Sequence, residues 1–415
     1  MNINSERHIA VVGAGIVGIC TAYFLQKSGF KVSLFDKELP GTMTSFGHAC
    51  TFADYANVPV NDPSLLMRMP SMLFKDDSPL SVDFFYILKN LPWAYKFLRN
   101  CHKDKVEEIA SSLANLLQHA KLSYDHIFED VNVSEFIKNE ENIYIYDSKE
   151  SFSKAQYANS LRKKNNIKVK DLSKKDILDL EPNLAQIYYS GHLFLGSRHT
   201  TNPLAISIKI FESFLQGGGQ YINENVKNLL NKGNLIEVCL EQKKIEFNQV
   251  VITAGAWSKS LGQMIGDNFP LDTERGYHVL FNVDKKLIDR PIGWSQSGFY
   301  LVQTEEGIRA AGTVEIAGLN KAPNQKRIQM IESQARKLLP QLGSVSSTWM
   351  GRRPTLPDSK PIIGRSNKNQ NILYAFGHQH IGWTLAAVTG KAINELAKGS
   401  QPNFDISAFS PNRFS

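Results

Sequence analysis

Residues 8–36 read HIAVVGAGIVGICTAYFLQKSGFKVSLFD and decide how the start of the chain folds. His8–Val12 is short, apolar and rich in β-branched residues, which predicts a buried strand. Ile16–Ser28 follows as a predicted helix, and Gly29 is a residue type that commonly ends one. Lys31–Phe35 alternates polar and apolar residues and predicts a second strand. A strand, a helix and a strand in this order predict a parallel sheet covered by helices, the α/β class.

The glycines between the first strand and the helix predict a dinucleotide site. They form the pattern GxGxxG from Gly13 to Gly18, and Asp36 follows the second strand. Gly13 permits the tight turn, Gly15 lets backbone N–H groups approach a pyrophosphate, and Gly18 lets the helix pack on the strand. The helix N-terminus offers partial positive charge to phosphates, and the Asp36 carboxylate can accept hydrogen bonds from ribose hydroxyls. The alternative is a tight turn with a surface aspartate.

The composition indicates a large globular protein. The chain has 415 residues, of which 42% are hydrophobic and 21% charged, and its net charge is +7. This length predicts about two to three domains, and the apolar fraction excludes disordered, collagen-like and coiled-coil chains. The Lys and Arg residues are scattered, so we expect no nucleic-acid partner. A positive net charge favours contact with anionic lipids or acidic substrates.

The cysteines and the first apolar run bear on location. The four cysteines are far apart and form no CxxC pair, which favours reduced thiols in a cytoplasmic protein. Ile9–Leu25 carries no charge, so it could be taken for a signal peptide or a membrane span. Three glycines interrupt it, and we interpret it as part of the nucleotide unit, with a targeting segment as the less favoured alternative.

Two later stretches repeat the pattern of a strand followed by a glycine loop. Gln249–Thr253 is apolar and precedes Ala254 and Gly255, small residues that let a nucleotide approach; the alternative is an ordinary strand and turn. Leu373–Phe376 precedes the loop GHQHIGWT at 377–384, which leads into a predicted helix. The N-terminus of that helix could stabilise negative charge on a flavin ring.

Two other chemistries are not favoured. His378 and His380 form an HxH pair, but no nearby Cys or acid completes a ligand set, so we expect no metal. The chain lacks the GxSxG pattern of a nucleophilic serine.

Helices and strands alternate through the rest of the chain. Predicted helices span 84–120, 203–215, 322–339 and 381–398, and predicted strands span 141–146, 235–240, 244–247 and 249–253. Because both chain ends show this alternation, we expect a nucleotide domain assembled from discontinuous segments, with a second domain inserted in the middle.

Separate blocks of sequence resemble the D-amino-acid oxidase-like flavoproteins, and most closely their bacterial D-amino-acid dehydrogenase branch. They are VVGAGIVGICTAYFL at 11–25, TSFGHAC at 44–50, TAGAWS at 253–258, and WMGRRPTLPDSKPIIG at 349–364 with GHQHIGWT at 377–384. The resemblance implies a mixed α/β (α+β) fold with a Rossmann-like FAD-binding domain and an inserted substrate-binding domain with an antiparallel sheet. We assign 1–83, 152–258 and 339–415 to the first domain, and 84–151 and 259–338 to the second.

The resemblance also implies FAD as the cofactor. No cysteine lies in Trp349–Pro354, where the sarcosine oxidases with covalent flavin carry theirs, so we expect noncovalent FAD. The residues expected to bind it are Gly13, Gly15, Ile16, Val17, Gly18, Asp36, Lys37, Thr44, Ser45, His48, Ala49, Val226, Gly255, Trp257, Gly351, His380, Ile381, Gly382, Trp383 and Thr384.

Two residues carry the expected catalytic site. In the family the arginine of a GxRP sequence binds the substrate carboxylate, which implies Arg353 here, and a guanidinium suits that task because it can form two parallel hydrogen bonds. Arg352 could be the functional one instead, or both could be structural. The family often has GYS or GYH at 276–278, which implies that Tyr277 shapes the pocket or binds the carboxylate, with a core tyrosine as the alternative.

The sequence departs from its relatives at two points. Relatives commonly read Asn-Ala-Gly where His48-Ala49-Cys50 stands, and GHG where Gly377-His378-Gln379 stands. Both segments lie near the flavin in the family, which puts the substrate preference in doubt.

The resemblance implies an enzyme that oxidises D-amino acids to 2-oxo acids and ammonia, by hydride transfer to flavin N5. The electron acceptor would be a quinone or O₂. The same fold could instead oxidise a secondary amine such as D-hydroxyproline or sarcosine, or a 2-hydroxy acid. A noncatalytic flavin-bearing subunit is an alternative of another class.

The segment Phe84–Asn100 bears on the membrane. It combines aromatic residues with Lys89, Lys96 and Arg99, which is typical of a segment lying on an anionic membrane surface. We therefore expect a cytoplasmic enzyme with possible peripheral contact at the inner face of the cell membrane. The alternative is that this segment packs into the substrate domain, since Pro92 interrupts any long amphipathic face.

Overall fold

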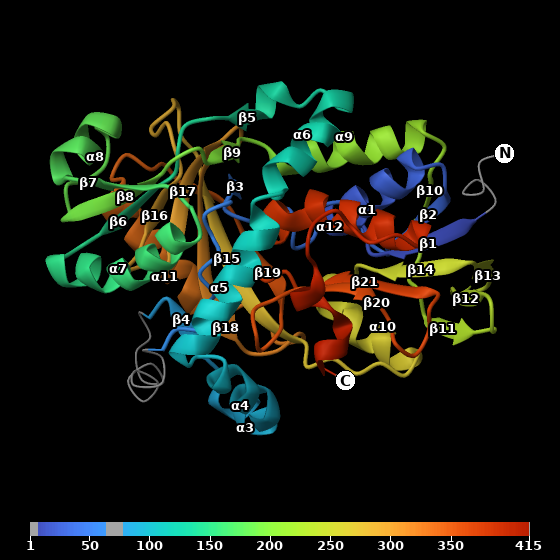
Figure 1. Ribbon diagram of the computed structural model, residues 1–415. Coiled ribbons are helices and arrows are strands. Elements are labelled where there is room, and N and C mark those ends of the chain that lie inside the picture. Colours follow the sequence, from blue (N-terminus) through green and yellow to red (C-terminus); the bar gives the residue numbers. More distant parts are fainter. Residues whose placement is uncertain (1–6, 64–77, 415) are drawn as a thin grey trace.

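The computed structural model describes residues 7–63 and 78–414. Its first sheet has the strand order β10-β2-β1-β14-β21-β20 (Figure 1). These strands are β10 (Gln220–Ile222), β2 (Lys31–Phe35), β1 (His8–Val12), β14 (Gln249–Ile252), β21 (Ile372–Phe376) and β20 (Ile362–Arg365). They run parallel except for β20, which is antiparallel to β21. The carboxyl ends of the parallel strands therefore meet at one edge.

Both faces of this sheet are covered, which explains why β1 is apolar throughout. Ile9 and Val11 pack into the core on one face, and Ala10 and Val12 into the core on the other. Helices cover the first face: α1 (Ile16–Lys27), α5 (Lys103–Leu117), α6 (Ala120–Asp130), α9 (Pro203–Gln216) and α12 (Gly382–Lys398). The second face is covered by α10 (Ser258–Met264) and by the antiparallel strands β11 (Asn228–Asn231), β12 (Ile236–Cys239) and β13 (Lys244–Phe247) (Figure 1).

A second, largely antiparallel sheet has the strand order β19-β15-β18-β17-β16-β6-β8-β7, with β4 beside β18. Its strands are β4 (Leu80–Val82), β6 (Ile143–Tyr146), β7 (Val169–Leu172), β8 (Ser190–Phe194), β15 (Asp272–Phe281), β16 (Ile292–Trp294), β17 (Phe299–Thr304), β18 (Gly307–Ile316) and β19 (Val345–Thr355). Helices α7 (Lys149–Lys164), α8 (Lys174–Leu180) and α11 (Gln325–Leu338) pack on it.

Smaller elements complete the fold. Strands β3 (Thr51–Phe52), β9 (Arg198–Thr200) and β5 (Ile137–Lys138) form a small antiparallel sheet. Helices α3 (Phe84–Lys89) and α4 (Leu91–Arg99) lie together at the edge of the molecule (Figure 1). Single 3₁₀ turns occur at Ser134–Phe136, Gly255–Trp257, Ser407–Phe409 and Pro411–Phe414.

The mixed helix-and-sheet fold and its N-terminal unit are confirmed. The strands of 8–12 and 31–35 have the predicted bounds, and the helix between them ends one residue earlier than predicted. The apolar run Ile9–Leu25 is thus β1 and most of α1. Among the described residues, no helix combines the length and the apolar character needed to cross a membrane.

The sheets divide the chain differently from the expected domain boundaries. Strands β7 and β8 fall within 152–258 and β19 within 339–415, yet all three pair in the second sheet. Helices α5 and α6 fall within 84–151 but pack into the core of the first sheet. The cause is pairing between distant strands, such as β6 beside β16, which no local pattern indicates. Part of the expected segment 1–83, residues 64–77, lies outside the described residues.

Candidate active site

A cavity of about 430 Å³ lies where the two sheets meet. Its lining comes from the carboxyl ends of β1, β2, β14 and β21, from the loop at 43–48, and from β15 and β19. In parallel α/β sheets, ligands bind at this edge. The described residues that line the cavity include a nucleotide-type glycine turn on the side of the first sheet and an arginine on the side of the second sheet, which we call the glycine end and the arginine end.

The glycine turn is shaped by close contact between two parallel strands. Gly13 has a φ of +116°, and a Cβ added to it would lie 2.6 Å from the carbonyl oxygen of Thr253. A Cβ on Gly18 would lie 1.8 Å from the carbonyl oxygen of Gly13. Gly15 is less crowded, because only the Ser45 hydroxyl lies near the position of its Cβ, at 3.3 Å. The turn therefore presents bare backbone to the cavity at the N-terminus of α1, where anions bind well.

Asp36 is held in place at the end of β2. Its carboxylate accepts hydrogen bonds from the backbone N–H groups of Ala14 (2.7 Å) and Glu38 (3.0 Å). Burial raises its pKa from the ordinary aspartate value, while these backbone hydrogen bonds oppose the shift. The neighbouring Lys37 lies over the ring of Trp257, 5.9 Å from its centre. All of these side chains except Ala14 line the cavity, as Val226 does.

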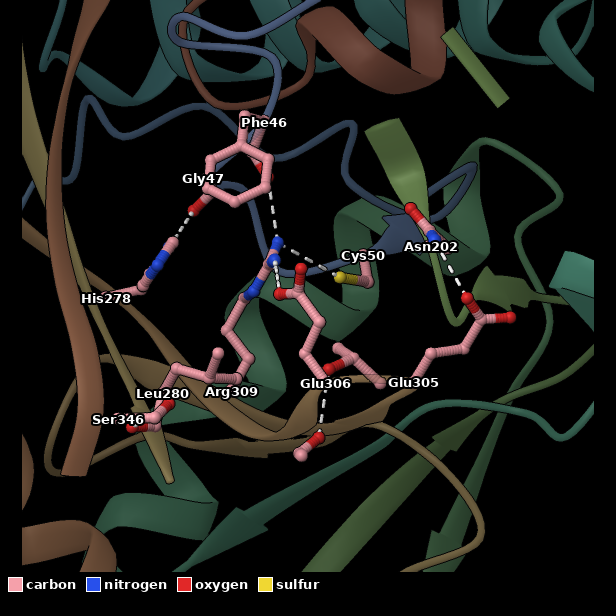
Figure 2. A network of polar contacts seen from close by, with 12 residues as sticks. Phe46, Gly47, Cys50, Asn202, His278, Leu280, Glu305, Glu306, Arg309 and Ser346 are labelled. Atoms are coloured by element: carbon pink, nitrogen blue, oxygen red, sulfur yellow. Dashed lines mark hydrogen bonds and ion pairs between the residues drawn. The ribbon is translucent and has the colours of Figure 1, made fainter. Parts of the chain in front are cut away.

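The loop at 44–50 is fixed by a buried arginine that no sequence motif indicates. Arg309 of β18 is 2% exposed, and its guanidinium donates to the Phe46 carbonyl at 2.8 Å and lies 3.6 Å from the Cys50 sulfur (Figure 2). His278 of β15 contacts the Gly47 carbonyl at 3.2 Å (Figure 2). Since the loop contributes His48 to the cavity, these two strand residues position part of the cavity wall.

His48 is a neutral imidazole whose proton position is fixed. Its Nδ1 accepts the backbone N–H of Cys50 at 2.9 Å, so the proton of the neutral ring is on Nε2. Burial, and then the charge of Arg309, hold its pKa well below the ordinary histidine value. The ring stacks on Trp383, with centroids 4.5 Å apart. Cys50, where relatives commonly have glycine, adopts a φ of +56°.

Arg353 of β19 lies at the opposite end of the cavity. Its guanidinium donates to the carbonyl of Thr313 at 2.7 Å and to that of Gly312 at 3.4 Å. It lies over Gly276, where an added Cβ would be 2.2 Å from Nη2. Arg353 thus occupies the space that a glycine on the neighbouring strand leaves free, with backbone carbonyls holding part of its donor set.

His380 shares this end of the cavity. His380 is exposed and lines the cavity, so a small molecule in the cavity can reach its ring. Desolvation by the protein around the cavity, and then the charge of Arg353, lower its pKa to about 4. His380 is therefore neutral at physiological pH, and Arg353 supplies the positive charge. His378 also lines the cavity, but it is buried, and its ring contacts the Thr389 hydroxyl at 3.0 Å.

Most of the residues expected at the cofactor or substrate line the cavity. They are Gly13, Gly15, Ile16, Val17, Asp36, Lys37, Thr44, Ser45, His48, Val226, Gly255, Trp257, Gly351, Arg353, His380, Gly382 and Trp383. The expected residues outside its lining are Gly18, Ala49, Tyr277, Ile381 and Thr384. Gly18 packs against the turn, and the Thr384 hydroxyl accepts the N–H of Ala53, so these two support the wall from behind.

Tyr277 is placed differently from the expectation. It is 1% exposed, its hydroxyl donates to Glu315, and it accepts the N–H of Asn324 at 3.1 Å. Side chains alternate between the two faces of a strand, and Gly276 of β15 is on the cavity side. Tyr277 therefore points into the core behind the second sheet. Arg352 also lies outside the lining, and its Nε donates to the carbonyl of Leu319.

A buried carboxyl group behind Arg353 was missed from the sequence. Glu274 is 3% exposed and lies opposite Arg353 in the pairing of β15 with β19. Nothing in the sequence signals this burial, because Glu274 stands among the polar and charged residues Asp272–Arg275 that begin β15. Charged residues are rarely fully buried unless paired, so such a run is normally expected at the surface.

The side chains that could ligate a metal are dispersed. Within residues 7–63 and 78–414, no group of three or more His, Cys, Asp and Glu side chains gathers in a way that could hold an ion. The cysteines Cys20, Cys50, Cys101 and Cys239 are free and buried.

Comparisons with known proteins agree with this geometry. The sequence profile of a family described as FAD dependent oxidoreductase matches residues 8–396. The D-amino-acid oxidase of Bradyrhizobium diazoefficiens is 33% identical over 98% of this chain and 99% of its own length. The D-amino acid dehydrogenase of Vibrio vulnificus is 24% identical over 94% of this chain and 96% of its own length.

Solved structures show the same fold. Glycine oxidase from Geobacillus kaustophilus superposes with a TM-score of 0.77 at 17% identity, covering 98% of this chain and 99% of that one. L-proline dehydrogenase from P. horikoshii superposes with a TM-score of 0.75 at 18% identity, covering 99% of this chain and 98% of that one.

FAD is the cofactor that the family description names, and the cavity fits it. The glycine turn, the N-terminus of α1 and Asp36 suit the diphosphate and the ribose. Nε2 of His48 and Nε1 of Trp383 are buried donors without a hydrogen-bond partner among the described residues, and both side chains line the cavity. Unpaired buried donors beside a cavity are expected where a bound group supplies acceptor atoms.

Proposed function

The chain belongs to the FAD dependent oxidoreductase family, and we propose that it oxidises D-amino acids to 2-oxo acids and ammonia with noncovalent FAD. The observation that carries this proposal is Arg353, a cation at the cavity end opposite the glycine turn. A guanidinium there binds a carboxylate through charge-assisted hydrogen bonds. The names of the relatives in Bradyrhizobium and Vibrio support the D configuration.

Substrate orientation is the main task of the residues at this end. The Thr313 and Gly312 carbonyls hold the guanidinium of Arg353, so its position is fixed before a substrate arrives. Thr313 has a φ of +57°, a strained conformation for this residue. This conformation lets the consecutive carbonyls of Gly312 and Thr313 both accept hydrogen bonds from Arg353. A carboxylate bound to Arg353 would hold the α-carbon inside the cavity.

The protein needs few acid–base groups for this reaction. When bound, FAD supplies the two-electron acceptor for the Cα–H bond. The amine must be neutral to form the imino acid, and the neutral rings of His48 and His380 place no positive charge of their own beside it. The imino acid then takes up water and releases ammonia to give the 2-oxo acid. The residues of this chain orient the substrate and exclude water.

An anaerobic substrate panel tests the proposal. Purified protein is mixed without O₂ with D-amino acids, their L-enantiomers, glycine, sarcosine, D-hydroxyproline and 2-hydroxy acids, and bleaching of the flavin absorbance is followed. Fastest bleaching by D-amino acids supports the proposal. Faster bleaching by a secondary amine or a hydroxy acid overturns the substrate assignment, and no bleaching by any compound indicates a noncatalytic subunit. Denatured protein should release yellow flavin into the supernatant, as expected for a noncovalent cofactor.

We also propose peripheral contact with the inner face of the cell membrane, through a surface formed by α3 and α4. Its exposed apolar residues are Phe84 (54% exposed), Phe85 (76%), Leu88 (48%), Leu91 (55%) and Tyr95 (63%). The exposed Lys89, Lys96 and Arg99 belong to the same two helices. Apolar side chains flanked by cations suit the boundary between acyl chains and anionic headgroups. This surface favours a membrane quinone over O₂ as the electron acceptor.

The α3–α4 surface is attached to the body by specific contacts. The Tyr86 hydroxyl donates to Asp272 at 2.7 Å, and Lys321 forms an ion pair with Asp83 at the start of α3. Pro92 lies in the first turn of α4, so it begins a helix instead of interrupting one. The exposed aromatic residues are therefore presented by an ordered pair of helices.

Vesicle sedimentation tests the membrane proposal. Anionic vesicles should carry the protein into the pellet at low salt, with less recovery at high salt and with neutral vesicles. Phe85→Asp should abolish the pelleting. Leu122→Asp is the matched control, because Leu122 is 71% exposed on α6, away from this surface. The membrane role would be wrong if the protein stayed equally in the supernatant under all conditions. It would also be wrong if Phe85→Asp and Leu122→Asp lost pelleting to the same extent.

A further inference from the structure

Glu274 is a buried carboxyl group that the proposed chemistry does not use. It is 3% exposed on β15, and the antiparallel register places it directly opposite Arg353 of β19. Residues paired in this way have their side chains on the same face of the sheet. Glu274 is not part of the cavity lining, whereas Arg353 is. The carboxyl group therefore lies behind the arginine, out of reach of a substrate.

The hydrogen bonds of Glu274 are incomplete. Its Oε1 accepts a hydrogen bond from the side-chain amide of Gln379 at 3.3 Å. Its Oε2 is buried and has no hydrogen-bond partner among the described residues, although the nearby Thr355 hydroxyl favours the ionised form of Glu274, as Gln379 does. A carboxylate in such a place is poorly stabilised, since an ionised group normally requires several donors or a close cation. Gln379 is divided between two acceptors, as it also donates to the Ser359 hydroxyl at 3.3 Å.

Two charged groups near Glu274 affect its ionisation, and they act in opposite directions. Arg353 on β19 attracts the ionised form, and Asp272 on its own strand repels it. On the other neighbouring strand, β18, the apolar Ile316 lies opposite Glu274. The loop after β21 contributes the neutral amide of Gln379, and His380 lies beyond it, next to Arg353. Arg353 is the cation that acts on Glu274, so a carboxylate bound by Arg353 would bring a negative charge close to Glu274.

We infer that Glu274 is a positioning residue that controls, through its protonation, how strongly Arg353 binds the substrate carboxylate. When Glu274 is ionised, it neutralises part of the charge of Arg353 and repels an incoming carboxylate. When Glu274 is protonated, Arg353 offers its full charge to the ligand. A bound carboxylate adds a second negative charge near Glu274, so binding above the midpoint takes up one proton, which Glu274 receives. The inference rests on the proposed role of Arg353.

The titration range of Glu274 makes this control effective near neutral pH. Burial raises its pKa to about 7, and the charge of Arg353 opposes the shift. Because ligand binding favours the protonated form, affinity is highest below this pKa and falls as pH rises through it. His380 titrates at about 4 and stays neutral over the same range, so it cannot produce this dependence.

Carboxylate binding by the flavin-loaded enzyme tests the inference. The probe is benzoate, which stays ionised between about pH 6 and 9 and has no amine of its own to titrate. Its dissociation constant is measured from the change in flavin absorbance, and proton uptake is measured by calorimetry in buffers with different ionisation enthalpies. In the wild type, the dissociation constant should rise by up to about tenfold per pH unit above the midpoint, with uptake of up to about one proton per ligand.

Three variants test whether Glu274, and not another group, causes the pH dependence of benzoate binding. Glu274→Gln cannot ionise, so its dissociation constant should stay flat with pH and its proton uptake should disappear. Gln379→Gly removes a donor that stabilises the ionised form, so the fall in affinity should move to higher pH. Glu181→Gln is the matched control: burial also raises the pKa of Glu181 to about 7, but it pairs with Arg290, and neither residue lines the cavity. This control should keep the wild-type profile.

The outcomes distinguish the inference from the function on which it rests. If Arg353→Ala binds benzoate as tightly as the wild type, the proposed role of Arg353 is wrong. If Arg353→Ala loses affinity but the wild type and Glu274→Gln share the same pH profile and proton uptake, only the role of Glu274 is overturned. Flavin content and the unfolding temperature, measured for each variant, show that a change in binding is not a loss of folding.

Discussion

The two ends of the cavity are built in different ways. At the glycine end, bare backbone forms the surface: Gly13 contacts the Thr253 backbone so closely that no Cβ fits, and Gly15 leaves the start of α1 open. At the arginine end, side chains form the surface, and Arg353 is held by carbonyls of β18 and faces a carboxyl group of β15. The first end depends on steric exclusion and the second on a balance of charges.

This difference determines how each end responds to change. A backbone surface tolerates no added atom, because the neighbouring strand cannot move without disturbing the sheet. At a surface made of side chains, a substitution changes ligand affinity gradually, since removing or adding a charge alters affinity without closing the space. We therefore expect substitutions at the glycine end to affect cofactor retention, and substitutions at the arginine end to affect substrate affinity and its pH dependence.

The largest effect is expected from Arg353→Ala. A carboxylate that loses a charge-assisted partner in a partly buried site loses about 2–5 kcal/mol, which corresponds to a rise in KM of roughly 30-fold or more. The FAD content should stay near that of the wild type, because the glycine end is unchanged. Steady-state kinetics with the best D-amino acid of the panel and flavin absorbance of the purified protein measure the two quantities.

Arg352→Ala is the control for that experiment. Its side chain lies outside the cavity lining and donates to the Leu319 carbonyl at 2.7 Å, so KM should change by no more than ~3-fold. A normal KM in Arg353→Ala with a large rise in Arg352→Ala would move the carboxylate site by one residue.

A smaller effect, of a different kind, is expected from Gly13→Ala. The φ of +116° and the contact of 2.6 Å with the Thr253 carbonyl both exclude a Cβ. Strain of about 1–3 kcal/mol should weaken FAD binding by roughly 5- to 150-fold, while KM of the fraction that retains flavin stays normal. The FAD dissociation constant is measured by titrating the flavin-free protein.

Gly233→Ala is the control for backbone strain alone. Gly233 also has a positive φ of +77°, but nothing lies within 4 Å of its added Cβ. This variant should lose some stability and keep its FAD. Equal loss of FAD in Gly13→Ala and Gly233→Ala would mean that general destabilisation, and not the contact with Thr253, causes the loss.

The glycine end was predictable from the sequence because its parts stand close together. The strand, turn, helix, second strand and acid all lie within residues 8–36, and each has a local signature. The small residues after the strand at 249–253 indicated that a nucleotide could approach there, but the sequence did not indicate the contact between Thr253 and Gly13. The parallel pairing of β1 with β14 is the step that brings them together.

The arginine end was only partly predictable. Arg353 was indicated by its resemblance to a family motif, while Glu274 and Arg309 are charged residues in strands, without a spacing that marks them. Their roles depend on the pairing of β15, β18 and β19, whose residues are far apart in the sequence. Tyr277 was expected in the pocket because 276–278 resemble a family segment, but the sequence does not say which face of β15 meets the cavity.

The smallest effect on catalysis is expected from Tyr277→Phe, and it tests which face of β15 meets the substrate. The Tyr277 hydroxyl donates to Glu315 and accepts the Asn324 N–H, both away from the cavity. Removing it leaves these buried groups short of a partner and should lower the free energy of unfolding by about 1–3 kcal/mol. KM and the pH profile of carboxylate binding should stay within about twofold of the wild type, as for substitutions away from a site. Thermal unfolding and KM are measured on the same preparation. A tenfold rise in KM with unchanged stability would instead place the hydroxyl at the substrate, and would mean that the face of β15 that carries Tyr277 meets the cavity.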